Sequence, residues 1–140
     1  MADSPARILR DLSLIAVVGL SRDPAKAAHR VPAELQAAGF RIVPVNPEAS
    51  ELLGERSFAT LAAIPYPVEL ALVFRPARFA PAIAEQAVAI GAKALWLQLG
   101  IVSNEARRIA EAAALRYVED QCAAVERARH GIVKSTPTRA

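Results

Sequence analysis

The sequence predicts an α/β protein, a single Rossmann-like, three-layer domain with a mostly parallel five-stranded sheet. Short apolar runs rich in β-branched residues alternate along the chain with segments whose apolar residues recur at helical spacing. The runs are continuous rather than alternating, which is typical of strands buried on both faces. The length of 140 residues fits one domain, and a hydrophobic content of 54% is enough to build a core.

The chain is expected to open with a short helix and a buried strand. Ser4 suits the N-cap and Pro5 the first position of a helix that continues to Leu12. Residues 14–18, with the sequence LIAVV, form the first strand, which stops at Gly19.

A helix and a second strand should follow. Residues 28–38 carry apolar side chains at helical spacing, and Gly39 is a suitable residue to end this helix. Residues 40–45 (FRIVPV) form the next strand. Pro44 lacks a hydrogen-bond donor, so this strand should end there or lie near an edge of the sheet.

The second half of the chain repeats the alternation and leads to a domain with two short flanking segments. The predicted boundaries are an N-terminal helical segment over 1–13, a binding domain over 14–127 and a flexible C-terminal tail over 128–140. The expected elements are one or two helical turns over 58–63, a strand over 70–74, a helix over 81–90, a strand over 94–97, a helix over about 103–114, a strand over 115–118, a last helix within 119–129 and frayed chain from His130.

Composition and charge exclude several classes of partner. The net charge of +3 comes from scattered residues, so no nucleic-acid stripe is indicated, whereas a small polyanionic ligand would suit it. The lone Cys122 cannot form an internal disulfide, which favours a reducing cytoplasm. His29 and His130 lack partners at metal-ligand spacing. The N-terminus does not resemble a signal peptide, and no apolar run could span a membrane.

Small polar groups, glycines and an arginine follow the predicted strands. In an open parallel sheet, ligands bind beyond the carboxyl ends of the strands, at the point where the strand order reverses. The sequence therefore predicts a ligand site on this rim. The residues at the five strand ends are Gly19, Leu20 and Ser21; Asn46 and Pro47; Phe74, Arg75 and Pro76; Gln98, Leu99 and Gly100; and Glu119, Asp120 and Cys122.

The first loop differs from the pattern for nicotinamide dinucleotides. Ser21 and Pro24 stand where G-x-G-x-x-G would have its second and third glycines, and Asn46 stands where an acid would bind the ribose. Coenzyme A fits better. Backbone N–H groups of the loop and the following helix can bind phosphate, and Lys26, with Arg30 nearby, supplies positive charge suited to a phosphorylated ribose.

Four motifs resemble a known family. AVVGLSRDP, FRIVPVNP, VFRP and GAKALWLQLGI occur in this order, and the similarity runs from about residue 14 to about residue 126. The chain resembles the small bacterial CoA-binding proteins, stand-alone relatives of the CoA-binding domain of the succinyl-CoA synthetase alpha subunit. The resemblance implies cofactor contacts from Gly19, Leu20, Ser21, Lys26, Val45, Asn46, Pro47, Phe74, Arg75, Gln98 and Gly100, with a closing D-x-C at Asp120 and Cys122.

Three features of the sequence call for separate expectations. Ala27-Ala28 replaces a common Pro-Ser, which removes a hydroxyl from the phosphate loop, and Gln121 replaces a common arginine. Both changes would weaken CoA binding or alter its preference. Trp96 also lies in a matching motif, but its place inside an apolar strand predicts a core residue.

The predicted function is a non-catalytic module that binds CoA or an acyl-CoA. No Ser–His–Asp order, His–Cys set or carboxylate pair suggests catalysis, and the phosphorylated histidine of the synthetase belongs to a domain that has no counterpart here. The module could serve an unidentified partner enzyme, and its apolar outer helices would suit a homodimer. Two alternatives stay open: binding of another nucleotide such as NAD(H), or thiol redox chemistry in which Cys122 forms a mixed disulfide with CoA.

Overall fold

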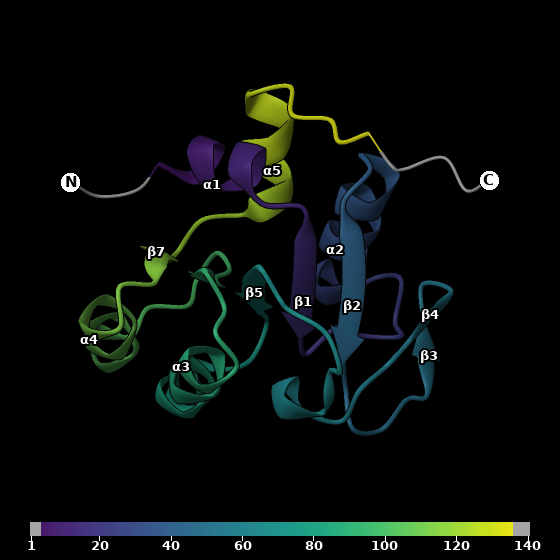
Figure 1. Ribbon diagram of the computed structural model, residues 1–140. Helices are drawn as coiled ribbons and strands as arrows, with labels where there is room; N and C mark the ends of the chain where they lie inside the picture. The colour runs from purple at the N-terminus through teal and green to yellow at the C-terminus, as the bar shows by residue number, and fades with distance from the viewer. Residues whose placement is uncertain (1–3, 136–140) are drawn as a thin grey trace.

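The computed structural model describes residues 4–135, and within this range five parallel strands form one twisted sheet (Figure 1). Every neighbouring pair in the sheet is parallel. The strands, in their order across the sheet, are β2 (Arg41–Val45), β1 (Leu14–Val18), β5 (Leu70–Val73), β6 (Ala94–Leu97) and β7 (Arg116–Val118).

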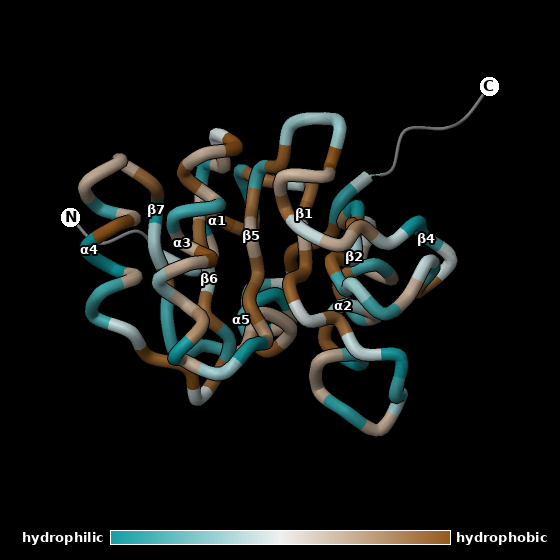
Figure 2. The backbone as a smooth tube through the Cα atoms, turned by 90° about the horizontal axis from the view of Figure 1, so that it is seen from below, coloured by the Kyte–Doolittle hydropathy of each residue, from teal (hydrophilic) through white to brown (hydrophobic). Residues whose placement is uncertain are grey.

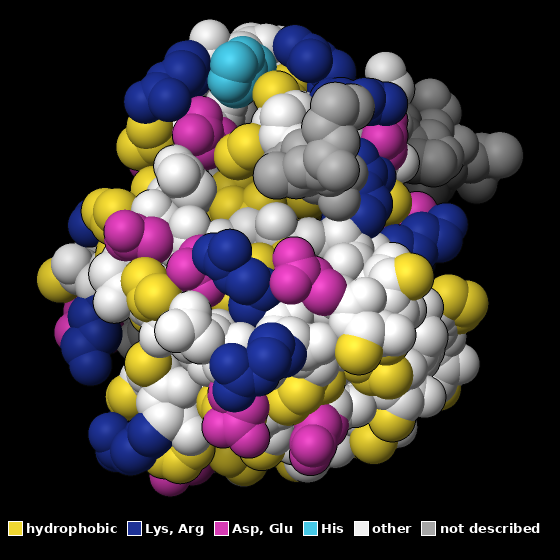
Figure 3. Space-filling model, turned by 90° about the vertical axis from the view of Figure 1, so that its left-hand side faces the viewer, with side chains coloured by type: hydrophobic (Ala, Val, Ile, Leu, Met, Phe, Trp, Pro, Cys, Tyr) yellow, Lys and Arg dark blue, Asp and Glu magenta, His cyan; other side chains and the backbone are white. Residues whose placement is uncertain are grey.

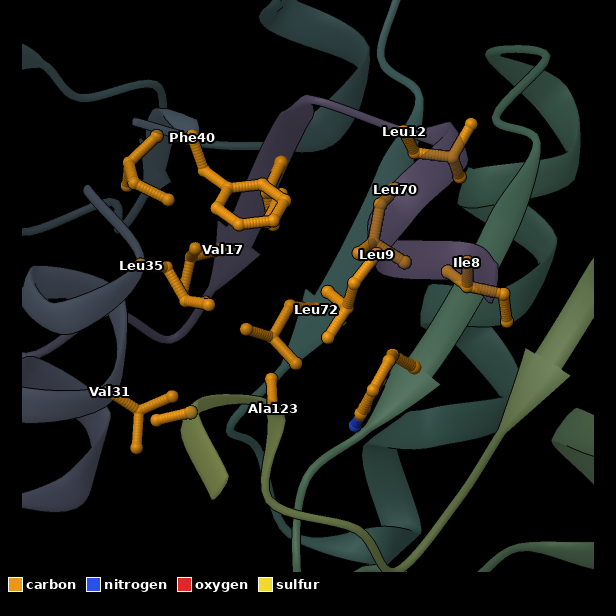
Figure 4. Packing of buried hydrophobic residues seen from close by; sticks show 14 of the residues in the cluster. Ile8, Leu9, Leu12, Val17, Val31, Leu35, Phe40, Leu70, Leu72 and Ala123 are labelled. Atoms are coloured by element: carbon orange, nitrogen blue, oxygen red, sulfur yellow. The ribbon is translucent and has the colours of Figure 1, made fainter. Parts of the chain in front are cut away.

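Helices cover both faces of the sheet, which confirms the predicted three-layer, Rossmann-like class. One hydrophobic cluster lies under α1, α2 and α5, and a second lies under α3, α4 and η1. Figure 4 shows the first cluster, where side chains from helices and strands point toward one another. The helical elements are α1 (Pro5–Asp11), α2 (Ala27–Ala37), η1 (Leu61–Ala63), η2 (Ala77–Phe79), α3 (Ala80–Ala89), α4 (Asn104–Ala112) and α5 (Ala123–Arg129).

Successive side chains of the central strand enter opposite clusters. In β1, Ile15 and Val17 pack into the cluster under α1, α2 and α5, while Ala16 and Val18 pack into the other. Because neighbouring side chains of a strand point to opposite faces, a strand covered on both sides needs a continuous apolar run. This is why LIAVV has no polar residue.

The residues predicted to begin and end helices have the contacts and backbone angles expected of them. The Ser4 hydroxyl accepts a hydrogen bond from the Arg7 N–H at 3.1 Å, and Ser103 caps α4 by accepting from the Ala106 N–H at 3.1 Å. Gly39 follows α2 with a φ of +99°, in the left-handed region that glycine enters most readily.

The strand order reverses at β1. The chain passes from β1 to the outer strand β2 and then crosses back to β5 on the other side of β1. The carboxyl ends of β1 and β5 therefore flank the switch point of the sheet. Pro44 lies in β2, an edge strand, as its missing donor predicts.

The segment after β2 differs from the prediction. It contains a hairpin of two short strands, β3 (Glu51–Leu52) and β4 (Glu55–Arg56), turned by Leu53 and Gly54 with φ values of 54° and 75°. Two consecutive positive φ values are typical of a tight hairpin turn, but leucine gives little sign of it in the sequence. Phe58 forms a bridge with Val45, so the expected helical turns begin only at η1.

The chain after α5 is also more closely packed than predicted. Ile132 is 6% exposed within the first cluster, and the Lys134 N–H donates to the Ala38 carbonyl at 2.7 Å. An apolar residue beyond the last helix thus anchors a stretch that was expected to fray from His130. The rest of the predicted tail, 136–140, lies outside the described residues.

Among the described helices, none is long and apolar enough to cross a bilayer.

Candidate functional site

A cavity of about 650 Å³ opens at the switch point of the sheet. Figure 2 views the molecule from below, the side toward which the arrow of β2 points in Figure 1. The walls come from the loop after β1, the loop after β2, the turn after β5, one side of α3 and the short segment before η1. The cavity therefore occupies the place that the sheet topology favours for a ligand.

The structure gathers most of the predicted contact residues around this cavity. Nine of the eleven line it, from three separate segments of the chain. These nine are Gly19, Leu20, Ser21, Lys26, Val45, Asn46, Pro47, Phe74 and Arg75.

Gly19 lets two strand ends approach closely. Its φ is +91°, and a Cβ at this position would lie 3.1 Å from the Phe74 carbonyl oxygen. The Gly19 N–H donates to the Val45 carbonyl at 3.0 Å. Glycine is therefore favoured here by both its backbone conformation and the space available, because a side chain would be strained at this φ and would crowd the Phe74 carbonyl.

The loop after β1 is held by its own hydrogen bonds. Ser21 donates its N–H to the Ala28 carbonyl at 3.1 Å, and its hydroxyl accepts from the Asp23 N–H at 3.0 Å. The Nδ1 atom of His29 lies 2.7 Å from the Ser21 carbonyl oxygen. These contacts fix the loop before the first turn of α2, whose leading N–H groups have no intrahelical acceptors.

Asn46 joins the first loop to the second. Its side-chain amide donates to the Leu20 carbonyl at 3.0 Å, and its Oδ1 accepts from the Glu48 N–H at 2.8 Å. Arg22 makes a further link by donating to the Glu48 carbonyl at 2.7 Å. Asn46 thus positions both loops, a role that needs an amide rather than an acid because one end must donate.

Positive side chains reach the cavity from both sides of the switch point. Arg22, Lys26 and Arg75 all line it, together with the acidic Glu48. The expected Arg30 does not, because it lies exposed on α2 beyond the loop. Arg22 was missed as a site residue, although its place directly after Ser21 in the phosphate loop was the available signal.

Arg75 is placed by an aromatic ring. Its guanidinium carbon lies 4.2 Å from the centre of the Phe79 ring, and that of Arg78 lies 4.6 Å from the same ring. An arginine stacked on an aromatic ring is oriented without losing its charge. Arg75 therefore remains able to donate hydrogen bonds to an anion in the cavity.

Gln98 and Gly100 lie outside the cavity lining. Gln98 is 5% exposed and its Oε1 accepts from the Ala123 N–H at 3.2 Å, which ties the end of β6 to the start of α5. Gly100 donates its N–H to Asp120 at 2.7 Å. Gln98 has a structural role that its position at a strand end did not reveal.

Trp96 is fully buried, as predicted, and donates to the Gln121 carbonyl at 2.8 Å.

Cys122 stands apart from the cavity. It is half-buried at the N-cap of α5 and packs against the first hydrophobic cluster. Within residues 4–135, no group of three or more histidine, cysteine or acidic side chains is arranged to hold a metal ion.

A smaller hollow of about 390 Å³ lies beside β7. Arg107 and Glu119 form an ion pair there at 2.8 Å, and the Tyr117 hydroxyl donates to Glu119 at 2.8 Å. Burial, reinforced by this hydrogen bond, raises the pKa of Tyr117 above its ordinary value. Figure 3 shows positive and negative side chains interspersed on this side of the molecule. The hollow thus lacks the excess of positive charge found at the switch point.

The fold and the position of the main cavity are those of a Rossmann-like ligand-binding domain. The family model described as "CoA binding domain" matches residues 13–128. The chain therefore belongs to the CoA-binding domain family, as the sequence motifs predicted.

Two relatives are similar to this chain along most of their own length. The uncharacterized protein YneT of Bacillus subtilis is 36% identical over 121 residues, which cover 86% of this chain and 90% of that protein. A solved structure of a hypothetical protein from Pyrococcus horikoshii OT3 superposes with a TM-score of 0.86 at 32% identity, covering 89% of this chain and 88% of that one.

A larger protein contains a similar segment. The ADP-forming acetate–CoA ligase II of Archaeoglobus fulgidus is 31% identical over 108 residues. The match covers 74% of this chain but only 16% of the ligase. The similarity is therefore to one part of a longer enzyme.

Proposed function

We propose that this protein is a non-catalytic module that binds CoA or an acyl-CoA in the cavity at the switch point. The observation that carries the proposal is the convergence of Arg22, Lys26 and Arg75 on a cavity bordered by the loop of a strand–loop–helix unit. A ligand with several phosphates suits this combination of charge and backbone donors.

The donor set fits the phosphates of CoA. Most main-chain N–H groups of the loop after β1 already donate within the chain, so the donors offered to a phosphate are mainly those of the first turn of α2. Lys26 stands at the N-cap of that helix. Arg22 lies in the same loop as Lys26, and Arg75 lies in the turn after β5, on the other side of the switch point. Three cations against one carboxylate, that of Glu48, would favour CoA over a ligand that lacks its 3′-phosphate.

The cavity residues support binding rather than catalysis. The side chains around the cavity are cations, amides, hydroxyls, apolar groups and the single carboxylate of Glu48, and the described lining includes neither a histidine nor a cysteine. A catalyst needs an activated nucleophile, an acid–base group or a metal near the reacting atoms. We therefore assign the residues to positioning and charge neutralisation.

Calorimetric titration tests the proposal. Wild-type protein titrated with CoA, dephospho-CoA and NAD should bind CoA most tightly, because only CoA carries the 3′-phosphate. Lys26→Ala should weaken CoA binding about tenfold, the usual order for one charge-assisted contact. Exposed Lys93→Ala, remote from the cavity lining, serves as the matched control. Clear binding of NAD without binding of CoA would overturn the proposal.

A further inference from the structure

His29 is a half-buried residue in the first turn of α2 that the proposed function leaves unused. Its Nδ1 atom lies 2.7 Å from the Ser21 carbonyl oxygen. A carbonyl oxygen can only accept, so Nδ1 carries the proton and donates it. Ser21 belongs to the described lining of the cavity, whereas His29 does not. The imidazole therefore acts on the loop after β1 and not directly on a ligand.

The hydrogen bond from His29 fixes the direction of one peptide unit. The first turn of α2 holds Ser21 at both main-chain groups, because the Ser21 N–H donates to the Ala28 carbonyl at 3.1 Å while its carbonyl accepts from His29. In a trans peptide, the C=O and the N–H of the next residue point to opposite sides. The described chain contains no cis peptide bond, so the Arg22 N–H is directed away from His29.

The Arg22 N–H is one of the few main-chain donors left available in this loop. Within the described chain, the N–H groups of Ser21 and Asp23 donate to acceptors of α2 and of the loop itself, whereas the Arg22 N–H has no acceptor. Arg22 lines the cavity. A main-chain N–H that has no partner in the protein is a suitable donor to an anion.

Two carbonyl oxygens of the same loop are held by side-chain donors. The Leu20 carbonyl accepts from the Asn46 amide at 3.0 Å, just as the Ser21 carbonyl accepts from His29. A carbonyl oxygen carries partial negative charge, so it would repel a phosphate if its peptide unit turned over toward the cavity. Asn46 and His29 thus keep the polarity of the loop suited to an anion.

We infer that His29 is a positioning residue for phosphate binding. Its Nδ1–H holds the peptide between Ser21 and Arg22 in the orientation that directs the Arg22 N–H to a phosphate of the ligand. This inference rests on the proposed function. It adds to the site a residue that does not touch the ligand and that lies outside the four sequence motifs.

His29→Asn and His29→Leu test the role of the donor. The two replacements have the same branched shape, but only the asparagine amide, whose nitrogen can take the place of Nδ1, donates to the Ser21 carbonyl. CoA affinity measured by calorimetry should stay within about threefold of wild type in His29→Asn and should fall about tenfold in His29→Leu, because a phosphate loses one charge-assisted hydrogen bond. Equal losses in both variants, or wild-type affinity in His29→Leu, would overturn the inference.

The amide resonance of Arg22 gives a second measurement, which a merely structural role of His29 would not affect. In nitrogen-15-labelled wild type, saturation with CoA should move the Arg22 amide proton downfield, as a new hydrogen bond to a phosphate requires. The shift should persist in His29→Asn and be lost in His29→Leu.

The outcomes of the resonance experiment separate the inference from the proposed function. Wild type that binds CoA without a change at Arg22, or a shift retained in His29→Leu, would overturn the role of His29 and leave the proposed function intact. Failure of the wild type to bind CoA would overturn the proposed function and the inference with it.

Discussion

At the scale of single residues, the site is built as much from structural contacts as from exposed donors. Asn46 uses both ends of its amide to join two loops, and Gly19 keeps two strand ends in contact. Both were predicted as site residues from sequence. Their contacts explain why those residue types are required, independently of any contact with the ligand.

Gly19→Ala should destabilise the protein more than the same substitution at a glycine whose surroundings are open. The new methyl group would approach the Phe74 carbonyl to 3.1 Å in a left-handed backbone. We expect a loss of about 2–3 kcal/mol in the free energy of unfolding, measured with urea.

Gly91→Ala provides the matched control for Gly19. Gly91 also has a positive φ, of +74°, but a Cβ added there would meet no atom of the surrounding described chain within 4 Å. Only the backbone penalty of about 1 kcal/mol should therefore appear. Equal losses in the two variants would show that the contact with Phe74 does not matter.

At the scale of elements, a carboxylate fastens the starts of two neighbouring strands. Glu69, just before β5, accepts hydrogen bonds from the N–H groups of Ser13 and Leu14 at 2.9 and 2.8 Å. Burial acts to raise the pKa of Glu69, but these two donors and the charge of Lys93 outweigh it and hold the pKa below its ordinary value of 4.5.

The Glu69 contact should make stability depend on pH. Because the pKa is lower in the folded state, the carboxylate stabilises the fold above the unfolded-state pKa, and this contribution is lost as the pH falls through the folded-state pKa. Glu69→Gln should therefore be less stable than wild type near pH 7, and the gap in urea unfolding should narrow near pH 3. Exposed Glu85→Gln is the control, and a gap independent of pH would contradict this account.

The elements that the sequence predicted share a clear local signal. The three central sheet strands, β1, β5 and β6, are continuous apolar runs, and Ser4 and Ser103 mark helix starts that the structure confirms. The β3–β4 hairpin was missed because each strand has two residues and its turn uses Leu53 at a positive φ. Such a turn depends on long-range support, for example the hydrogen bond from Gln36 to the Leu53 carbonyl at 3.0 Å.

At the scale of the whole molecule, the end of the chain closes the first hydrophobic cluster. Ile132 packs into it with 6% of its surface exposed, while its neighbour Val133 is 72% exposed. Ile132→Ala should lower the free energy of unfolding by about 2–4 kcal/mol, and Val133→Ala should change it by less than about 0.5 kcal/mol. Thermal and urea unfolding measure both, and equal effects would mean that this stretch does not belong to the core.

Most of the residues that line the main cavity could be predicted from the sequence, because the carboxyl ends of parallel strands meet at one edge of the sheet. The sequence could not show which residues at that edge line the cavity and which are buried inside the protein. Gln98 follows a strand as Asn46 does, yet its side chain turns inward to Ala123. Arg22 was missed although it directly follows Ser21, but its hydrogen bond to the Glu48 carbonyl depends on how two loops fold together and could not be predicted.

A crystal structure of the protein soaked with CoA would show directly where the phosphates bind. We expect them between the loop after β1 and Arg75, within hydrogen-bond distance of Lys26 or Arg22. Phosphates bound in the hollow beside β7, next to Arg107 and Tyr117, would contradict this expectation.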